Sequence, residues 1–156
     1  MGKGAVPVRG VIAVAMVLAL WAGSDSLAQG VGFLTEQQRL ASYCTGVSEA
    51  RVRELNDFLK VDCAGSKRKE CAAAADELAR AQVMDRRLWA YLMKEIFTSK
   101  DQGPRERALS YGQMTKGGDD WVACKRRPPR TDPDSLPVCR ESRGCLIGER
   151  FSFLPP

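Results

Sequence analysis

The alternation of apolar and polar residues divides the chain into an apolar N-terminal run, three segments with helical patterning and a proline-rich tail. The first helical segment is expected to begin at Thr35, because Thr35-Glu36-Gln37-Gln38 has the form of a capping box, with Thr35 as N-cap and Gln38 three positions into the helix. Apolar residues then recur close to every 3.6 positions toward Lys60. Gly46 weakens the middle, and Ser48 could cap a second segment. The pattern therefore allows either one kinked helix or two helices in series.

The second segment carries the clearest helical pattern in the chain. At 100° per residue, Arg80, Arg87 and Lys94 fall on one side, and the apolar residues gather on the other, namely Cys71, Ala74, Ala75, Leu78, Ala81, Leu88, Trp89, Leu92, Met93 and Ile96. Because the polar link at 64–68 is short, the two segments are predicted to form an antiparallel hairpin. The apolar face is interpreted as core, with an interaction surface as the alternative.

The remaining residues predict less regular structure. Pro104 suits the first turn of a short third helix at about 104–115, and Gly117-Gly118 should break the chain after it. From Lys125 onward, prolines argue against regular helix, so the tail is expected to be extended or turn-rich, with a short strand within 146–154. These prolines are Pro128, Pro129, Pro133 and Pro137. The predicted fold is mainly α: an antiparallel helical hairpin, a short third helix and a proline-rich, disulfide-tied C-terminal tail.

The N-terminus has the pattern of a secretory signal peptide. The apolar run Val11 to Gly23 follows two basic residues, and its 13 residues fit a signal sequence, whereas a membrane span needs ~20. Ser26-Leu27-Ala28 places small residues at the −3 and −1 positions of a cleavage site. Residues 1–28 are therefore predicted to be cleaved after Ala28, with an uncleaved anchor as the alternative. Residues 29–156 would form a single small domain, with a helical core at about 35–115 and a loop-rich tail at about 116–156.

All six cysteines follow the predicted cleavage site, and an even number in an exported chain indicates three disulfides. Their spacings lack the close pairs typical of zinc sites and the C-x-x-C motif of redox proteins. In a hairpin that turns near Lys67, Cys63 and Cys71 lie at the same level and should pair. The other predicted pairs are Cys139–Cys145, as a local loop, and Cys44–Cys124, which would tie the tail to the hairpin.

Composition excludes several kinds of chemistry. The chain contains no histidine, which rules out histidine-dependent catalytic triads, histidine-ligated zinc and haem attachment through C-x-x-C-H. Ser66-Lys67-Arg68-Lys69 matches the S-x-x-K pattern of acyl enzymes but lacks its companion motifs. We therefore predict a non-enzymatic protein with no catalytic, cofactor-binding or metal-binding residues. The alternative is a hydrolase, such as a glycan-cleaving enzyme, that uses two carboxylates across a cleft.

The most basic segment of the chain is a candidate binding site. The residues after the predicted cleavage site include 22 basic and 18 acidic side chains, a net charge of +4 that solubility alone explains. Four of the basic residues cluster in one short stretch: Lys125, Arg126, Arg127 and Arg130. Export argues against a nucleic-acid partner. The expected partner is an anionic envelope component, such as lipid phosphate, or an acidic protein, and the alternative is a solvated loop. The predicted setting is the periplasm or the exterior, without a membrane span in the mature chain.

One further hypothesis concerns a polar contact within the hairpin. Arg51 and Asp85 both fall on apolar faces, and pairing Cys63 with Cys71 brings them within reach of each other. The sequence therefore predicts a partly buried ion pair that specifies helix register more than it adds stability. The alternative is that Gly46 rotates the first helix, so that Arg51 points to solvent.

Overall fold

The computed structural model describes residues 33–66, 68–126, 132, 135–147 and 151–154, and these residues are mainly helical, without a strand. The helices are α2 (Glu36–Val61), α3 (Lys69–Leu92), a π-helix η2 that continues it (Met93–Phe97), α4 (Pro104–Lys125) and α5 (Pro137–Gly144). The mainly helical prediction is therefore confirmed. The predicted signal peptide, Arg127, Arg130 and three of the tail prolines lie outside the described residues.

Helix α2 begins where the capping box predicts and runs unbroken. The Gln38 N–H donates to Thr35 Oγ1 at 3.1 Å, and the Thr35 N–H donates to Gln38 Oε1 at 2.9 Å. Helical structure continues through Gly46 and Ser48. Ser48 does not cap a second helix, because its hydroxyl lies toward the Ala81 carbonyl of α3, 3.4 Å away. The first segment is thus one helix rather than two in series.

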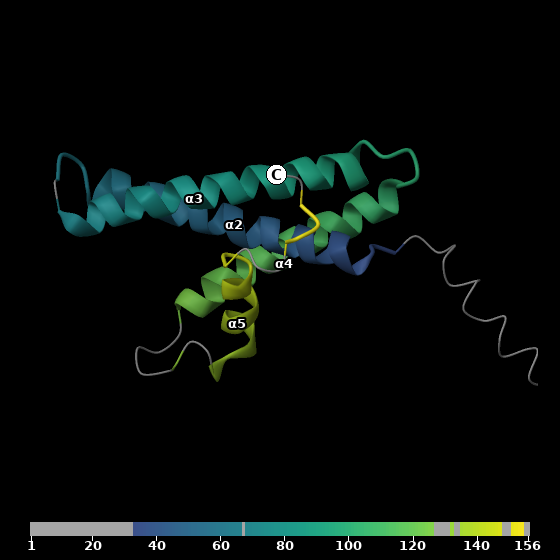
Figure 1. Ribbon diagram of the computed structural model, residues 1–156. Coiled ribbons are helices and arrows are strands. Elements are labelled where there is room, and N and C mark those ends of the chain that lie inside the picture. The colour runs from purple at the N-terminus through teal and green to yellow at the C-terminus, as the bar shows by residue number, and fades with distance from the viewer. Residues whose placement is uncertain (1–32, 67, 127–131, 133–134, 148–150, 155–156) are drawn as a thin grey trace, which may run out of the picture. The chain divides into compact units, whose positions relative to one another are not determined.

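Helices α2 and α3 form the predicted antiparallel hairpin, side by side in Figure 1. Near the turn, Leu55, Ala74 and Ala81 form a small apolar cluster. Toward the other end, larger side chains such as Leu88 and Ile96 are fully buried in the main core. Cys63 and Cys71 are bonded across the turn, as the hairpin register predicts.

Helix α4 is longer than predicted, because Gly117 and Gly118 do not break it. A Cβ added at Gly117 would lie 2.0 Å from the Tyr43 carbonyl oxygen of α2, and one at Gly46 would lie 1.8 Å from the Met114 carbonyl oxygen of α4. The two backbones therefore touch at points where only glycine fits. Contact with α2 compensates for the low helix propensity of glycine. The pattern of apolar residues along the sequence does not reveal this contact.

The tail also differs from the prediction. Pro137 starts the helix α5 rather than preventing one, because the first helical position needs no N–H donor. The predicted strand within 146–154 is wrong for the residues described there, which form turns and bends. Phe151 and Leu154 are buried and pack in the main core. Residues near the C-terminus thus cover the helical hairpin instead of forming a sheet.

Two predicted disulfides are wrong. The structure pairs Cys44 with Cys145 and Cys124 with Cys139, with Cα atoms 5.1 Å apart in each pair. Because α5 is helical, Cys139 and Cys145 lie at opposite ends of it and cannot close a local loop. Cys139 is instead bonded to Cys124 at the end of α4, and Cys145 is bonded to Cys44 in α2.

No helix in the described part of the chain is both long enough and apolar enough to cross a membrane.

Candidate functional site at the base of the basic loop

The disulfide between Cys124 and Cys139 encloses the most basic segment of the chain. We call residues 125–138 the basic loop. This loop has four basic and two acidic side chains, and its two ends are joined covalently at the end of α4 and the first turn of α5. The predicted binding segment therefore lies between two cysteines that a disulfide joins.

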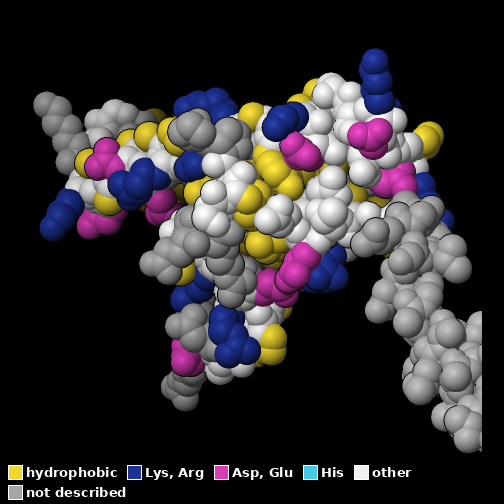
Figure 2. All heavy atoms as spheres, turned by 45° about the vertical axis from the view of Figure 1, so that its right-hand side comes forward, with side chains coloured by type: hydrophobic (Ala, Val, Ile, Leu, Met, Phe, Trp, Pro, Cys, Tyr) yellow, Lys and Arg dark blue, Asp and Glu magenta, His cyan; other side chains and the backbone are white. Residues whose placement is uncertain are grey.

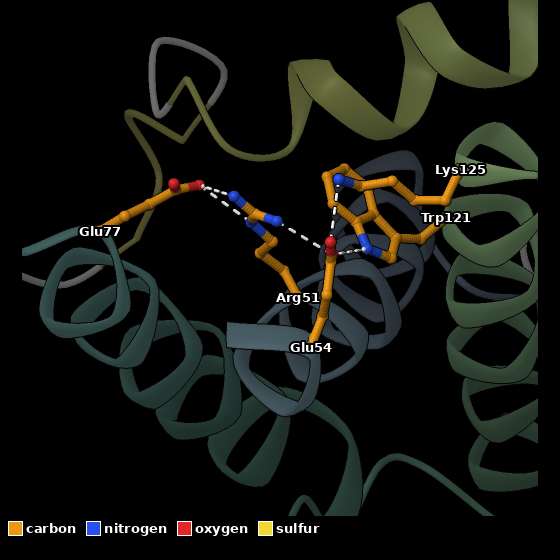
Figure 3. Close-up of polar contacts among 5 residues, drawn as sticks. All are labelled: Arg51, Glu54, Glu77, Trp121 and Lys125. Carbon is orange, nitrogen blue, oxygen red and sulfur yellow. Dashed lines mark hydrogen bonds and ion pairs between the residues drawn. The ribbon is translucent and has the colours of Figure 1, made fainter. Parts of the chain in front are cut away.

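Lys125, the first residue of the basic loop, is held against α2 (Figure 3). Its Nζ lies 2.9 Å from Glu54 Oε1 and 5.4 Å from the centre of the Trp121 ring. The Trp121 indole N–H donates to the other Glu54 oxygen at 3.0 Å. Lys125 therefore fixes the base of the loop, and much of its charge is already compensated by Glu54.

Arg51 joins this group to the hairpin. Its guanidinium lies 2.9 Å from Glu54 Oε2 and 5.5 Å from the centre of the Trp121 ring. It also binds Glu77 of α3, with the Arg51 Nε 2.9 Å from Glu77 Oε1 (Figure 3). Partial burial alone would raise the pKa of Glu54, but its contacts with Lys125 and Arg51 outweigh burial and lower that pKa. Glu54 thus stays ionised and links α2 to α4, and Arg51 links this pair to α3 through Glu77.

The predicted Arg51–Asp85 ion pair is wrong. Arg51 turns toward Glu54, Glu77 and Trp121, on the side of α2 that faces the end of α4. Asp85 has a buried Oδ1 atom without a hydrogen-bond partner. Burial, with a smaller contribution from the charge of Glu49, raises the pKa of Asp85 to about 6 despite opposing effects of Ser48 and Arg86.

Two exposed arginines flank the disulfide that closes the basic loop. Arg126 follows the last residue of α4, and Arg140 lies in α5 directly after Cys139. Figure 2 shows Lys and Arg side chains at the projecting end formed by α5 and the end of α4. Since a disulfide joins their neighbours, these two arginines come from different helices to the same end of the molecule.

Sequence reasoning found part of this site. It identified Lys125 and Arg126, and the other two predicted residues, Arg127 and Arg130, lie outside the described structure. It missed Glu54 and Trp121, although Glu54 lies three positions after Arg51, a spacing that brings side chains together on a helix. It also missed Arg140, because its segment was expected to be irregular and Cys139 was assigned a different partner.

Comparison with known proteins finds no matching family model, no matching curated protein and no matching solved structure. Function is therefore inferred from the residues and their arrangement.

Proposed function

We propose that this is an exported, non-enzymatic interaction protein of the cell envelope that binds an anionic partner through the basic loop. The observation that carries the proposal is the Cys124–Cys139 disulfide, which joins the ends of the segment richest in positive charge. Closing a loop reduces the number of conformations available to it before binding, which lowers the entropy cost of forming a complex.

The charges at the loop have distinct roles in this proposal. Lys125 is compensated by Glu54 and anchors the base, so attraction of the partner comes from Arg126, Arg127, Arg130 and Arg140. Arginine binds phosphate and carboxylate oxygens through paired hydrogen bonds, which suits a lipid phosphate or an acidic protein surface. Three disulfides support the export part of the proposal, because such bonds persist in oxidising compartments.

Vesicle binding tests the loop. Purified, oxidised protein is mixed with vesicles of phosphatidylglycerol and phosphatidylcholine, and with vesicles of phosphatidylcholine alone, over a range of salt concentrations. We expect binding only to the anionic vesicles, with release as salt rises, because salt screens exposed charges over ~8 Å at physiological ionic strength. Changing the four arginines to Gln should abolish binding.

A matched control removes four other exposed charges far along the sequence from the loop: Lys60, Lys69, Arg80 and Lys100. This variant has the same net charge as the arginine variant and should retain most of the binding. Equal losses in the two variants would show that only net charge matters and would contradict a site at the loop.

Export is tested separately by N-terminal sequencing of the processed protein, which should start at Gln29.

A further inference from the structure

A groove between α2, α3 and α4 lies apart from the residues of the basic loop. It has a volume of about 470 Å³, within the size range of small-molecule sites, roughly 300–1,000 Å³. Gly46 of α2 and Gly118 of α4 both line it. Since neither residue has a side chain, the groove is lined at these positions by the backbones of two helices that approach each other closely.

Two aromatic side chains line the groove. Tyr111 is 54% exposed although it is a large residue. Trp89 is partly buried, and its indole N–H donates to Glu49 at 2.9 Å, which holds the ring in one orientation. Phe97, the last residue of the π-helix η2, lies between the two, with its ring centre 6.0 Å from that of Trp89 and 5.0 Å from that of Tyr111. The core thus supports both rings, while Tyr111 presents apolar surface to solvent.

Polar groups of both charges share the groove with these rings. Glu49 and Asp119 supply acceptors, and Arg53 supplies donors. The lining therefore offers both hydrogen-bond acceptors and hydrogen-bond donors to a ligand. It matches a sugar ring, which has an apolar face of C–H groups that packs on an aromatic ring and a rim of hydroxyls that both donate and accept hydrogen bonds.

We infer that the groove lined by Trp89, Tyr111, Glu49, Arg53 and Asp119 binds an uncharged sugar unit of a glycan chain. Tyr111 packs against the C–H face of the sugar, and the carboxylates and guanidinium bind its hydroxyls. The inference is independent of the basic loop, since it concerns different residues and a ligand without charge.

The experiment is a titration of the purified, oxidised protein with the tetramer of N-acetylglucosamine, an uncharged glycan. Binding is measured by calorimetry and by NMR of the indole N–H signals. We expect the Trp89 signal to shift and the Trp121 signal to stay in place, because Trp121 does not line the groove. The four-arginine loop variant should bind the tetramer unchanged, so this test is separate from the vesicle test.

Variants locate the binding. Tyr111→Ala should weaken it by about tenfold, whereas Tyr111→Phe, which keeps the ring, should stay within a few-fold of the parent. Phe33→Ala is the matched control, since Phe33 is an aromatic residue 64% exposed outside the groove, and it should have no effect.

Three results would overturn the inference. The first is absence of binding to the tetramer, and the second is equal binding by the parent and Tyr111→Ala. The third uses the fully deacetylated tetramer, which carries positively charged amines. Tighter binding of that probe, lost in Asp119→Asn, would make the groove a cation site instead of a site for an uncharged sugar.

Discussion

Helix α2 packs against its two neighbours in physically different ways. Against α3 it uses apolar side chains, such as Leu55 near the turn. Against α4 the two backbones touch at Gly46 and Gly117, and a buried pair of hydroxyls, Ser42 and Ser110, lies between the helices with oxygen atoms 2.7 Å apart. The first interface can adjust by moving side chains, and the second cannot, because a carbonyl oxygen has nowhere to move without bending a helix.

This difference explains how the molecule keeps its shape. The α2–α3 interface supplies apolar burial along a hairpin that a short turn already favours. The α2–α4 interface depends on a few positions without side chains, and it brings the end of α4 close enough for Lys125 and Trp121 to contact Glu54. Disrupting the glycine contacts should therefore affect the base of the basic loop as well as stability.

The largest expected effect comes from two disulfides of very different loop length, one between α2 and the end of α5 and one across the turn between α2 and α3. Replacing Cys44 and Cys145 with Ala removes a disulfide whose cysteines are 101 positions apart in the sequence. Because this bond closes a long loop, its loss should reduce the free energy of unfolding by about 4.7 kcal/mol. Replacing Cys63 and Cys71, whose separation is 8, should cost about 2.6 kcal/mol, because a short loop restricts the unfolded chain less. Urea unfolding of both double variants measures the difference, and equal losses would contradict this account.

The next effect compares glycines within α4. Gly117→Ala should destabilise the protein by about 3 kcal/mol, because its methyl group would collide with the Tyr43 carbonyl. Gly112→Ala is the matched control, since nothing lies within 4 Å of a Cβ there, and it should stabilise the protein by about 0.5–1 kcal/mol. Thermal unfolding followed by circular dichroism separates the two, and a tolerated Gly117→Ala would mean that α2 and α4 do not touch.

The smallest effect concerns Asp85 on the α3 side. Burial raises its pKa from 3.8 to about 6 in the folded state, so the folded protein binds this proton more tightly than the unfolded chain. Protonated Asp85 therefore favours the folded state at about pH 4, and this stabilisation is lost as the pH rises through about 6. Asp85→Asn removes this ionisation, and it should stabilise the protein by ~1 kcal/mol at pH 7 and have little effect at pH 4.

Unfolding in urea at the two pH values checks this expectation. Glu70→Gln is a suitable control, because Glu70 is an exposed carboxylate in the first turn of the same helix. A loss of stability in Asp85→Asn at pH 7 would show that the ionised form of Asp85 is favoured in the folded protein.

The sequence was informative where side chains decide the structure. The capping box at Thr35, most of the apolar face of α3 and the Cys63–Cys71 pair follow from local spacing, and the structure has them. Ala75 and Met93, which were expected on that face, are exposed. Periodicity reports which face of a helix is buried, and a short link restricts which cysteines can meet. These are local properties of the chain.

The sequence was misleading where long-range contacts decide the structure. Gly117 has a low helix propensity, yet α4 continues through it because the backbone of α2 lies against it. The partners of Cys44 and Cys124 depend on where α5 packs, which no spacing along the chain specifies. The Arg51 contacts likewise depend on Trp121, which joins the site only because α4 is long enough to bring it there.

The nested order of the disulfides has a consequence for how the protein reaches this structure. A ribosome produces Cys44 before any other cysteine and its partner Cys145 after all the others, so the first thiol made is the last that can pair correctly. Cys63 and Cys71, by contrast, can pair as soon as the hairpin turn exists. Any disulfide that Cys44 forms before Cys145 has been made is therefore non-native, and thiol–disulfide exchange has to release it. Maturation should accordingly depend on a disulfide isomerase more than on the supply of oxidant.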